Sequence, residues 1–373
     1  MTREELAAWL QLVQADGIGP DSARRLLAAF GLPEQIVAQS RPALEQVVSS
    51  RQAEALRNPA PETLALIDTT WAWLQQDDGL QRRLLTLGSP DYPSSLLQMA
   101  DPPVLLYGLG QVDRLAASQG MAMVGSRNPT PQGAINARQF ARAFADLGWT
   151  VVSGLALGVD AAAHEGALSG FDATLHAGPS TIAVVGTGLD RVYPRQHREL
   201  AHRIAQTGVL LSECPLGAPP LAHHFPQRNR IIAGLSHGVL VVEAAPQSGS
   251  LITARLASEQ GKEVFAIPGS IHSPQSRGCH ALIRQGAKLV ESAEDVLEEL
   301  RPGLVRRDAP ALPQRTHDDP VLEALGYDPV SLDALLARTG MDTATLQARL
   351  LELELDGEVG RLPGGLFQRM ASA

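Results

Sequence analysis

The chain of 373 residues is 44% hydrophobic and carries a formal net charge of −9. That length supports one large core together with one or two small domains. No run of about 18 apolar residues occurs, and Glu4 and Glu5 stand where a signal peptide would be basic. Cys214 and Cys279 alone make neither a disulfide framework nor a four-ligand zinc site. We therefore expect a cytoplasmic protein without a membrane partner, a metal or a cofactor.

The charge is unevenly distributed along the chain. Residues 1–80 carry 6 basic and 11 acidic side chains, whereas residues 81–290 carry 17 basic and 13 acidic ones. The tail after residue 320 is acidic again, with 4 basic against 8 acidic side chains. Because binding to nucleic acid depends on neutralising phosphates, only the central region has a composition that favours such a partner.

Residues 1–75 predict a small all-helical domain. The turn at 16–20, followed by an amphipathic stretch at 22–27, is typical of a helix-hairpin-helix or SAM-like fold. The backbone amides of such a turn can hold a DNA phosphate, but a helical packing module explains the pattern equally well. The acidic surroundings weigh against DNA contact by this domain.

Residues 82–300 alternate short β-branched runs with helical stretches. This pattern predicts an α/β domain with an extended Rossmann-like, mostly parallel sheet that is covered on both faces. The expected strands are 121–124, 150–152, 181–185, 209–212, 238–242 and 263–267. In such a sheet, the ligand site lies where the carboxyl ends of the strands meet their loops.

Residues 301–319 are rich in proline and polar side chains, which predicts a linker. The following residues, 320–373, predict a winged-helix domain with helices at 331–337 and 342–354 and a strand pair around 359–368. The second helix and its flanks are dominated by acidic side chains, whereas a winged helix that reads DNA is usually basic there. We therefore expect this domain to contact protein or support a dimer.

Four strand ends carry small or hydroxyl-bearing residues with basic neighbours. Glycine lets a phosphate approach the backbone, hydroxyls and helix starts add hydrogen-bond donors, and arginine adds charge. The candidate DNA-binding residues in these loops are Gly125, Ser126, Arg127, Ser153, Gly154, Gly186, Thr187, Gly188, Arg195, Ser248, Gly249 and Ser250. Tyr193, beside Arg195, adds a ring on which a base can stack. Taken singly, each loop is also explained by an ordinary turn or helix cap.

Arg228, Asn229 and Arg230 are further candidates, because they precede an apolar helix beside His223 and His224. They either line the same rim or form a solvated helix start. Lys262 is one of only two lysines in a chain that strongly favours arginine, and it lies three residues before Phe265. A phosphate contact by the lysine with base stacking on the phenylalanine is one interpretation. A core position for Phe265 is the other.

Asp160 and His164 stand four residues apart on one expected helical face. They are either an acid–base pair or metal ligands, or a helix cap and a residue that packs against the loop. The second interpretation is favoured, because two ligands rarely make a metal site. No GxxxxGK[ST] motif is present, which disfavours a P-loop ATPase.

Six blocks follow in order: VGSRNPTPQG, SGLALGVDAAAHEGAL, TIAVVGTGLDRVYPRQH, HHFPQRNRIIAGLS, VVEAAPQSGSLITARLASEQGKEVFAIPG and GCHALIRQGAKLV. Together they resemble the DprA/Smf family over residues 84–300. The resemblance implies a homodimer that binds single-stranded DNA and promotes loading of the RecA recombinase in natural transformation. It also implies DNA contacts at Arg127, Arg195, Lys262 and Phe265. The segment 169–180 departs from the family pattern, because it is longer than the usual turn.

Two other functions compete with this one. Nucleotide phosphoribohydrolases of the lysine-decarboxylase-like Rossmann class carry a PGGxGTxxE loop, but the corresponding stretch here, PQSGSLITA at 246–254, has no glutamate at that point. Only Asp160, His164 and Glu243 are available to supply the missing acid. A protein-interaction adaptor that docks through its acidic end domains would leave the basic loops without a role. We therefore expect a binding protein and not an enzyme.

Overall fold

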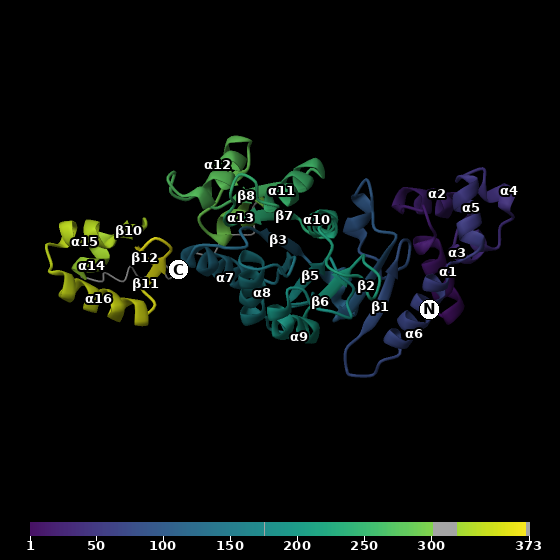
Figure 1. Cartoon of the computed structure of the whole chain (residues 1–373), viewed down its shortest axis with the longest axis horizontal. Helices are drawn as coiled ribbons and strands as arrows, with labels where there is room; N and C mark the ends of the chain where they lie inside the picture. Colours follow the sequence, from purple (N-terminus) through teal and green to yellow (C-terminus); the bar gives the residue numbers. More distant parts are fainter. Residues whose placement is uncertain (175, 301–318, 371–373) are drawn as a thin grey trace.

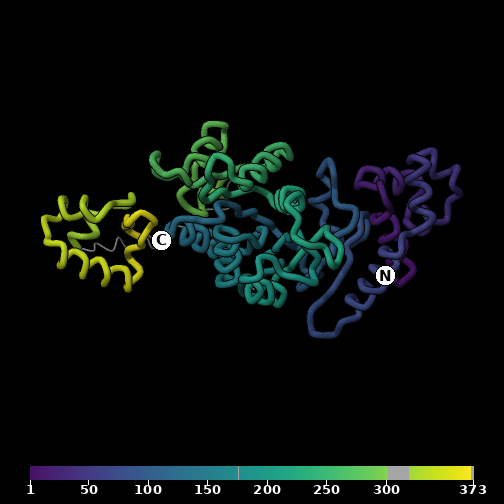
Figure 2. The backbone as a smooth tube through the Cα atoms, viewed as in Figure 1, coloured from purple at the N-terminus to yellow at the C-terminus, as the bar shows by residue number. Residues whose placement is uncertain are grey.

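The computed structural model describes residues 1–174, 176–300 and 319–370. The predicted linker, apart from its last residue Asp319, lies outside the described residues. The mostly parallel sheet predicted from the sequence is present, and all six expected strands are found in it. The N-terminal helices lie beside one edge of this sheet, as Figures 1 and 2 show.

The N-terminal unit consists of six helices. Its helices are α1 (Arg3–Gln14), α2 (Pro20–Phe30), α3 (Pro33–Val37), α4 (Arg41–Leu44), α5 (Ser50–Arg57) and α6 (Pro61–Leu74). Thr2 and Glu5 form a capping box at the start of α1, and α2 starts after the turn that the sequence predicted. The apolar core of the unit continues onto the sheet, where Trp73 packs edge-on against Tyr107 with ring centroids 6.1 Å apart.

The central sheet has nine strands in the order β1-β2-β6-β5-β4-β3-β7-β8-β9. The strands are β1 (Arg82–Thr86), β2 (Leu105–Gly110), β3 (Gly120–Val124), β4 (Thr150–Ser153), β5 (Thr181–Val185), β6 (Val209–Ser212), β7 (Gly238–Val241), β8 (Glu263–Ala266) and β9 (Lys288–Leu289). β2 pairs antiparallel with both β1 and β6, and the other pairs are parallel. The carboxyl ends of β3 to β8 therefore meet at one edge.

Helices cover both faces of the sheet. One face packs against α10 (His224–Gly234), α11 (Ser250–Glu259) and α12 (Arg277–Arg284). The other face packs against α7 (Pro131–Asp146), α8 (Val159–Gly170), α9 (Arg198–Thr207) and α13 (Ala293–Leu300). Figure 1 shows the two layers on opposite sides of the strands. Burial on both faces explains why these strands are apolar runs without alternation.

The C-terminal unit has the helices and strands of a winged helix. It contains α14 (Pro320–Leu325), β10 (Val330–Ser331), α15 (Leu332–Thr339), α16 (Thr343–Leu355), β11 (Val359–Leu362) and β12 (Leu366–Arg369). Ser331 and Asp342 cap α15 and α16, which matches the predicted helix starts. Its separate core is built around Leu335, Leu346 and Leu350.

Within the described residues, no helix combines the length and the apolar character needed to cross a bilayer.

Candidate functional site

The loops after β3, β4, β5 and β7 meet at the carboxyl edge of the sheet, because these four strands are neighbours in it. The start of α10 closes over them. A cavity of about 670 Å³ opens there, and a smaller hollow of about 60 Å³ adjoins it. We call the two together the central pocket. Among its lining residues are Gly125, Ser126, Arg127, Gly154, Gly186, Thr187, Tyr193, Phe225, Arg228, Asn229, Ser248, Gly249 and Ser250.

An arginine and two aromatic rings stand at the mouth of the central pocket. The Arg127 guanidinium lies 5.8 Å from the centroid of the Phe225 ring, and that ring lies 5.7 Å from the ring of Tyr193. Arg127 is exposed and forms no ion pair with any described residue, and Tyr193 is 48% exposed. This group offers an unneutralised positive charge next to flat apolar surfaces, which suits a phosphate and an unstacked base.

A buried arginine forms the floor of the pocket. Arg228 donates from Nη1 to the carbonyl oxygen of Val184 at 2.7 Å, and its Nη2 lies 3.9 Å from Oδ2 of Asp160. Its Nε has no partner among the described residues. A side chain on Gly154 would overlap the guanidinium, so glycine is needed there for steric reasons. Burial lowers the pKa of Arg228, and the nearby carboxylate of Asp160 opposes that shift.

Asp160 and His164 hold the loop between β4 and α8. Oδ2 of Asp160 accepts hydrogen bonds from the backbone N–H groups of Gly154 (3.1 Å) and Ala156 (3.3 Å). Nε2 of His164 accepts from the N–H of Leu155 at 3.3 Å, and its Nδ1 lies 2.8 Å from Oγ1 of Thr181. Leu155 has a φ of +58°, a conformation that costs free energy and needs such support. The packing interpretation is therefore confirmed for His164. Asp160 does not cap α8, whose N-cap residue is Gly158 and has no side-chain cap hydrogen bond; Asp160 instead holds the loop that precedes the helix.

His164 should make the stability of the loop depend on pH. Burial lowers the pKa of His164 from 6.5 to about 3, so the folded protein holds this ring neutral where the unfolded chain binds a proton. The free energy of unfolding should therefore fall as the pH drops from about 6.5 towards 3. Urea titrations of the wild type and His164→Gln at several pH values test this. The variant should lose part of the pH dependence, and an unchanged dependence would contradict the assignment.

The hydroxyl-bearing loops contribute mostly backbone and short side chains. Oγ of Ser126 accepts from the N–H of Asn128 at 3.1 Å, and Ser248 and Ser250 share a 2.7 Å hydrogen bond at the start of α11. Nδ2 of Asn229 reaches the carbonyl oxygen of Gly249 at 3.4 Å, which links α10 to this loop. These contacts fix the pocket wall and leave several polar atoms facing the cavity.

Three predicted DNA-binding residues are placed outside the pocket. Ser153 is buried and donates its hydroxyl to the carbonyl oxygen of Met123 at 2.7 Å. The backbone at Gly188 packs against the carbonyl oxygen of Pro215. Arg230 points away from the pocket and pairs with Glu213 at 2.6 Å and with Asp101 at 3.2 Å, which neutralise its charge. These contacts favour structural roles for the three residues, away from the lining of the central pocket.

Lys262 and Phe265 also require correction. Nζ of Lys262 donates to the carbonyl oxygens of Ala233 (2.6 Å) and Gly234 (2.8 Å), at the carboxyl end of α10. Phe265 is 0% exposed and packs in the core. Because Lys262 precedes β8, it lies at the amino edge of the parallel strands, opposite the pocket. A phosphate contact by the lysine and base stacking on the buried ring are both contradicted by this placement.

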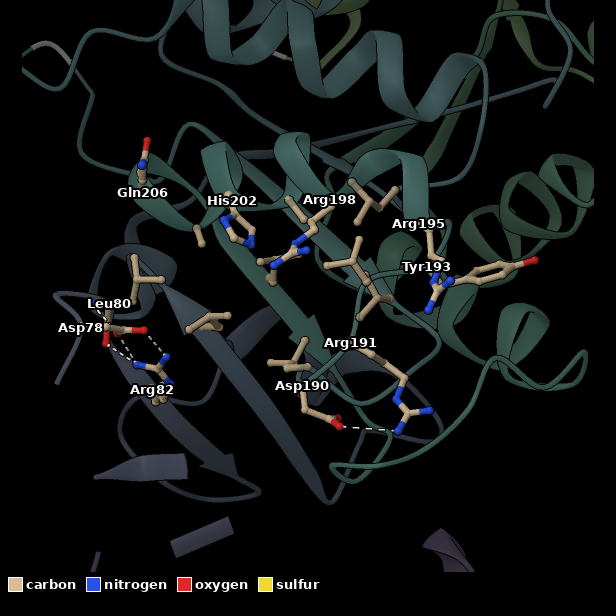
Figure 3. A pocket seen from close by; sticks show the side chains of 18 of the residues that line it. Asp78, Leu80, Arg82, Asp190, Arg191, Tyr193, Arg195, Arg198, His202 and Gln206 are labelled. Atoms are coloured by element: carbon tan, nitrogen blue, oxygen red, sulfur yellow. Dashed lines mark hydrogen bonds and ion pairs between the residues drawn. The ribbon is translucent and has the colours of Figure 1, made fainter. Parts of the chain in front are cut away.

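Arg195 lies beside the central pocket, in a neighbouring groove that also contains Arg191 and Arg198 (Figure 3). Phe225, by contrast, is a pocket residue that the sequence did not single out. It stands one helical turn before Arg228. An aromatic residue at this spacing from a candidate arginine is the feature of the sequence that could have identified Phe225 as a site residue.

The fold and the pocket together define a Rossmann-like protein with a basic and aromatic site at the carboxyl edge of its sheet. Residues 83–301 match the model of the DNA recombination-mediator protein A family, and residues 292–365 match the DprA winged helix domain. The chain belongs to the DNA recombination-mediator protein A family.

Individual relatives agree with this membership. Protein Smf of Escherichia coli is 42% identical over 311 residues, which cover 80% of each chain. The structure of DNA processing protein A from Streptococcus pneumoniae superposes with a TM-score of 0.67 at 36% identity, over 80% of this chain and 98% of that one. DNA processing protein A from Helicobacter pylori, described with its single-stranded DNA binding mode, gives a TM-score of 0.51 at 32% identity over 58% and 95%.

Proposed function

We propose that this protein binds single-stranded DNA in the central pocket and thereby promotes the loading of RecA onto the strand during natural transformation. The observation that carries the proposal is the unpaired Arg127 beside the rings of Phe225 and Tyr193, above the buried Arg228. The two arginines supply charge for phosphates, and the rings supply surfaces for bases. The likeness to the Helicobacter pylori protein, whose single-stranded DNA binding mode has been described, supports it further.

A single strand suits the pocket better than a duplex. Stacking on Phe225 or Tyr193 requires a base whose face is free, and a base in a duplex is covered by its neighbours. Stacking also tolerates any sequence, because every base has a π-face. Binding should therefore tolerate different sequences and weaken with salt.

Removing the Phe225 ring should weaken binding without unfolding the protein. Loss of one base–aromatic stack costs about 1–3 kcal/mol, so Phe225→Ala should raise the Kd for a poly-dT oligonucleotide by about 5- to 150-fold. Fluorescence anisotropy of a labelled oligonucleotide measures this. The matched control is Phe171→Ala, which removes another half-buried ring that faces an arginine, Arg114 at 5.9 Å, but follows α8 at the opposite edge of the sheet. Equal losses in both variants would contradict the proposed site.

A homodimer is part of the proposal. An apolar groove of about 730 Å³ runs between α12 and β9, and its lining includes Ile271, Ile283 and Leu289. Ile271 is 72% exposed and Leu289 is 51% exposed, although apolar side chains of this size are usually covered. β9 is also the edge strand of the sheet, which leaves its outer side free for a second subunit. Two copies joined here would hold two central pockets in one assembly.

Binding without catalysis is the activity we propose. Both carboxylate oxygens of Glu243 accept hydrogen bonds from Thr130, and Asp160 and His164 hold the neighbouring loop. These three side chains are therefore engaged in structural hydrogen bonds and are not free for proton transfer at a ligand. Incubation with nucleoside monophosphates should release no free base, whereas RecA assembly on a single strand should accelerate when the protein is added.

A further inference from the structure

A second groove adjoins the central pocket, between α9 and the connector that joins α6 to β1. It encloses about 900 Å³. Figure 3 shows Arg198, His202 and Gln206 following one another along α9, with Asp78 and Arg82 across from them. Its floor is apolar and includes Leu80, Leu109, Leu189 and Leu210. We call it the exit groove.

The exit groove shares part of its wall with the central pocket. Tyr193 and Val185 line both cavities. The ring of Tyr193 contacts Phe225 on the pocket side, and the next basic side chain along the chain, Arg195, lies on the groove side. A strand that stacks a base at Phe225 and passes Tyr193 can therefore enter the groove. Asp190, the acidic side chain in the groove lining near Tyr193, pairs with Arg191 at 3.6 Å, which offsets its charge.

The charges of the groove suit a phosphate backbone. Arg195 and Arg198 are exposed, and no described residue forms an ion pair or a hydrogen bond with either guanidinium. Positions 195, 198 and 202 are spaced by three and four residues, so their side chains share one side of η3 (Arg195–His197) and α9. Positive side chains aligned on one side of a helix can contact successive phosphates of a DNA backbone. Long-range attraction between the protein and DNA would not require this alignment.

The opposite wall does not repel an anion. Both carboxylate oxygens of Asp78 accept hydrogen bonds from Arg82, each at 2.6 Å. Arg82 in turn stands 5.7 Å from the centroid of the Trp73 ring, which fixes the pair against the N-terminal helices. The one acidic side chain on this wall among the described lining residues is therefore neutralised by its neighbour.

We propose that the exit groove is a second subsite for single-stranded DNA, in which Arg198 binds a phosphate that lies beyond the nucleotides held in the central pocket. This proposal rests on the proposed function. The apolar floor gives the bases of the outgoing strand a surface to cover, and the connector after α6 forms one side of the path. The N-terminal unit would then contribute to DNA binding by shaping this wall.

Oligonucleotide length separates the two subsites. We would measure anisotropy with labelled poly-dT of about 5 and about 20 nucleotides, because comparable single-strand sites span about 4–16 nucleotides. Arg198→Ala should bind the short oligonucleotide like the wild type. It should bind the long one about threefold to tenfold more weakly, and the slope of log K against log salt should fall by about 0.7. Arg203→Ala is the matched control, because Arg203 is an exposed arginine on the same helix that does not line the groove.

The possible outcomes distinguish the two proposals. Equal binding of the long oligonucleotide by Arg198→Ala and the wild type would overturn the second subsite, and so would an equal loss in Arg203→Ala. A loss that is the same for both lengths would also overturn it, since the arginine would then act on the central pocket. Failure of the wild type to bind even the short oligonucleotide would instead contradict the proposed function.

Discussion

Replacing Arg127 by alanine should weaken the binding of a poly-dT oligonucleotide by about 10- to 150-fold. Arg127 carries an exposed guanidinium at the mouth of the central pocket, where no described acidic residue neutralises it. A charge-assisted contact to a phosphate contributes about 1.5–3 kcal/mol, and its loss gives that change in Kd. The salt dependence should decrease as well, by about 0.7 in the slope of log K against log salt. Fluorescence anisotropy over a salt series measures both quantities.

The control for this experiment is Arg142→Ala. Arg142 is an exposed arginine near the carboxyl end of α7, where it lies 3.8 Å from Asp146 and far along the helix from the pocket. Both variants remove one positive charge from the central domain. If the two lost the same affinity, binding would depend on overall charge, and Arg127 would have no specific role.

Replacing Arg228 by methionine should have the largest effect on stability. This substitution keeps the volume of the side chain but removes the charge that faces Asp160. Burial raises the pKa of Asp160, and the guanidinium of Arg228 is the foremost group that opposes this rise. A buried carboxylate left without its partner costs about 3–5 kcal/mol. The free energy of unfolding from urea titration should fall by about that amount, and DNA binding should be lost with the shape of the pocket floor.

A double variant separates lost charge from lost shape. Asp160→Asn combined with Arg228→Met removes both charges, while the asparagine oxygen can still accept from Gly154 and Ala156. The double variant should recover part of the stability but none of the DNA affinity. An unchanged unfolding free energy in Arg228→Met alone would show that the pair is not coupled in the way its geometry indicates.

The central strands were predictable because each is an apolar, β-branched run followed by small residues, a pattern that parallel strands share. The loops at their carboxyl ends followed from the same argument, and this placed Arg127 and Gly154 in one site. β1 and β2 were not predicted. They are antiparallel strands at the edge of the sheet, and β2 contains two glycines that obscure its pattern.

The site itself was only partly predictable, because composition does not show in which direction a side chain points. Arg228 and Arg230 are two residues apart on α10, so they face different sides, one under the pocket and one towards Glu213. Lys262 could have been rejected from topology alone, since a residue that precedes a parallel strand lies at the edge opposite the loops. Phe225 depends on how α10 crosses the strand ends, which only the tertiary structure reveals.

Single-stranded DNA should bind in the central pocket through its phosphates and its stacked bases. The most direct test compares labelled poly-dT with a duplex of equal length, by anisotropy at about 50 and about 200 mM salt. We expect tight binding of the single strand that weakens steeply with salt, and much weaker binding of the duplex. Equal affinity for both forms, or an affinity for the single strand that does not change with salt, would contradict the account.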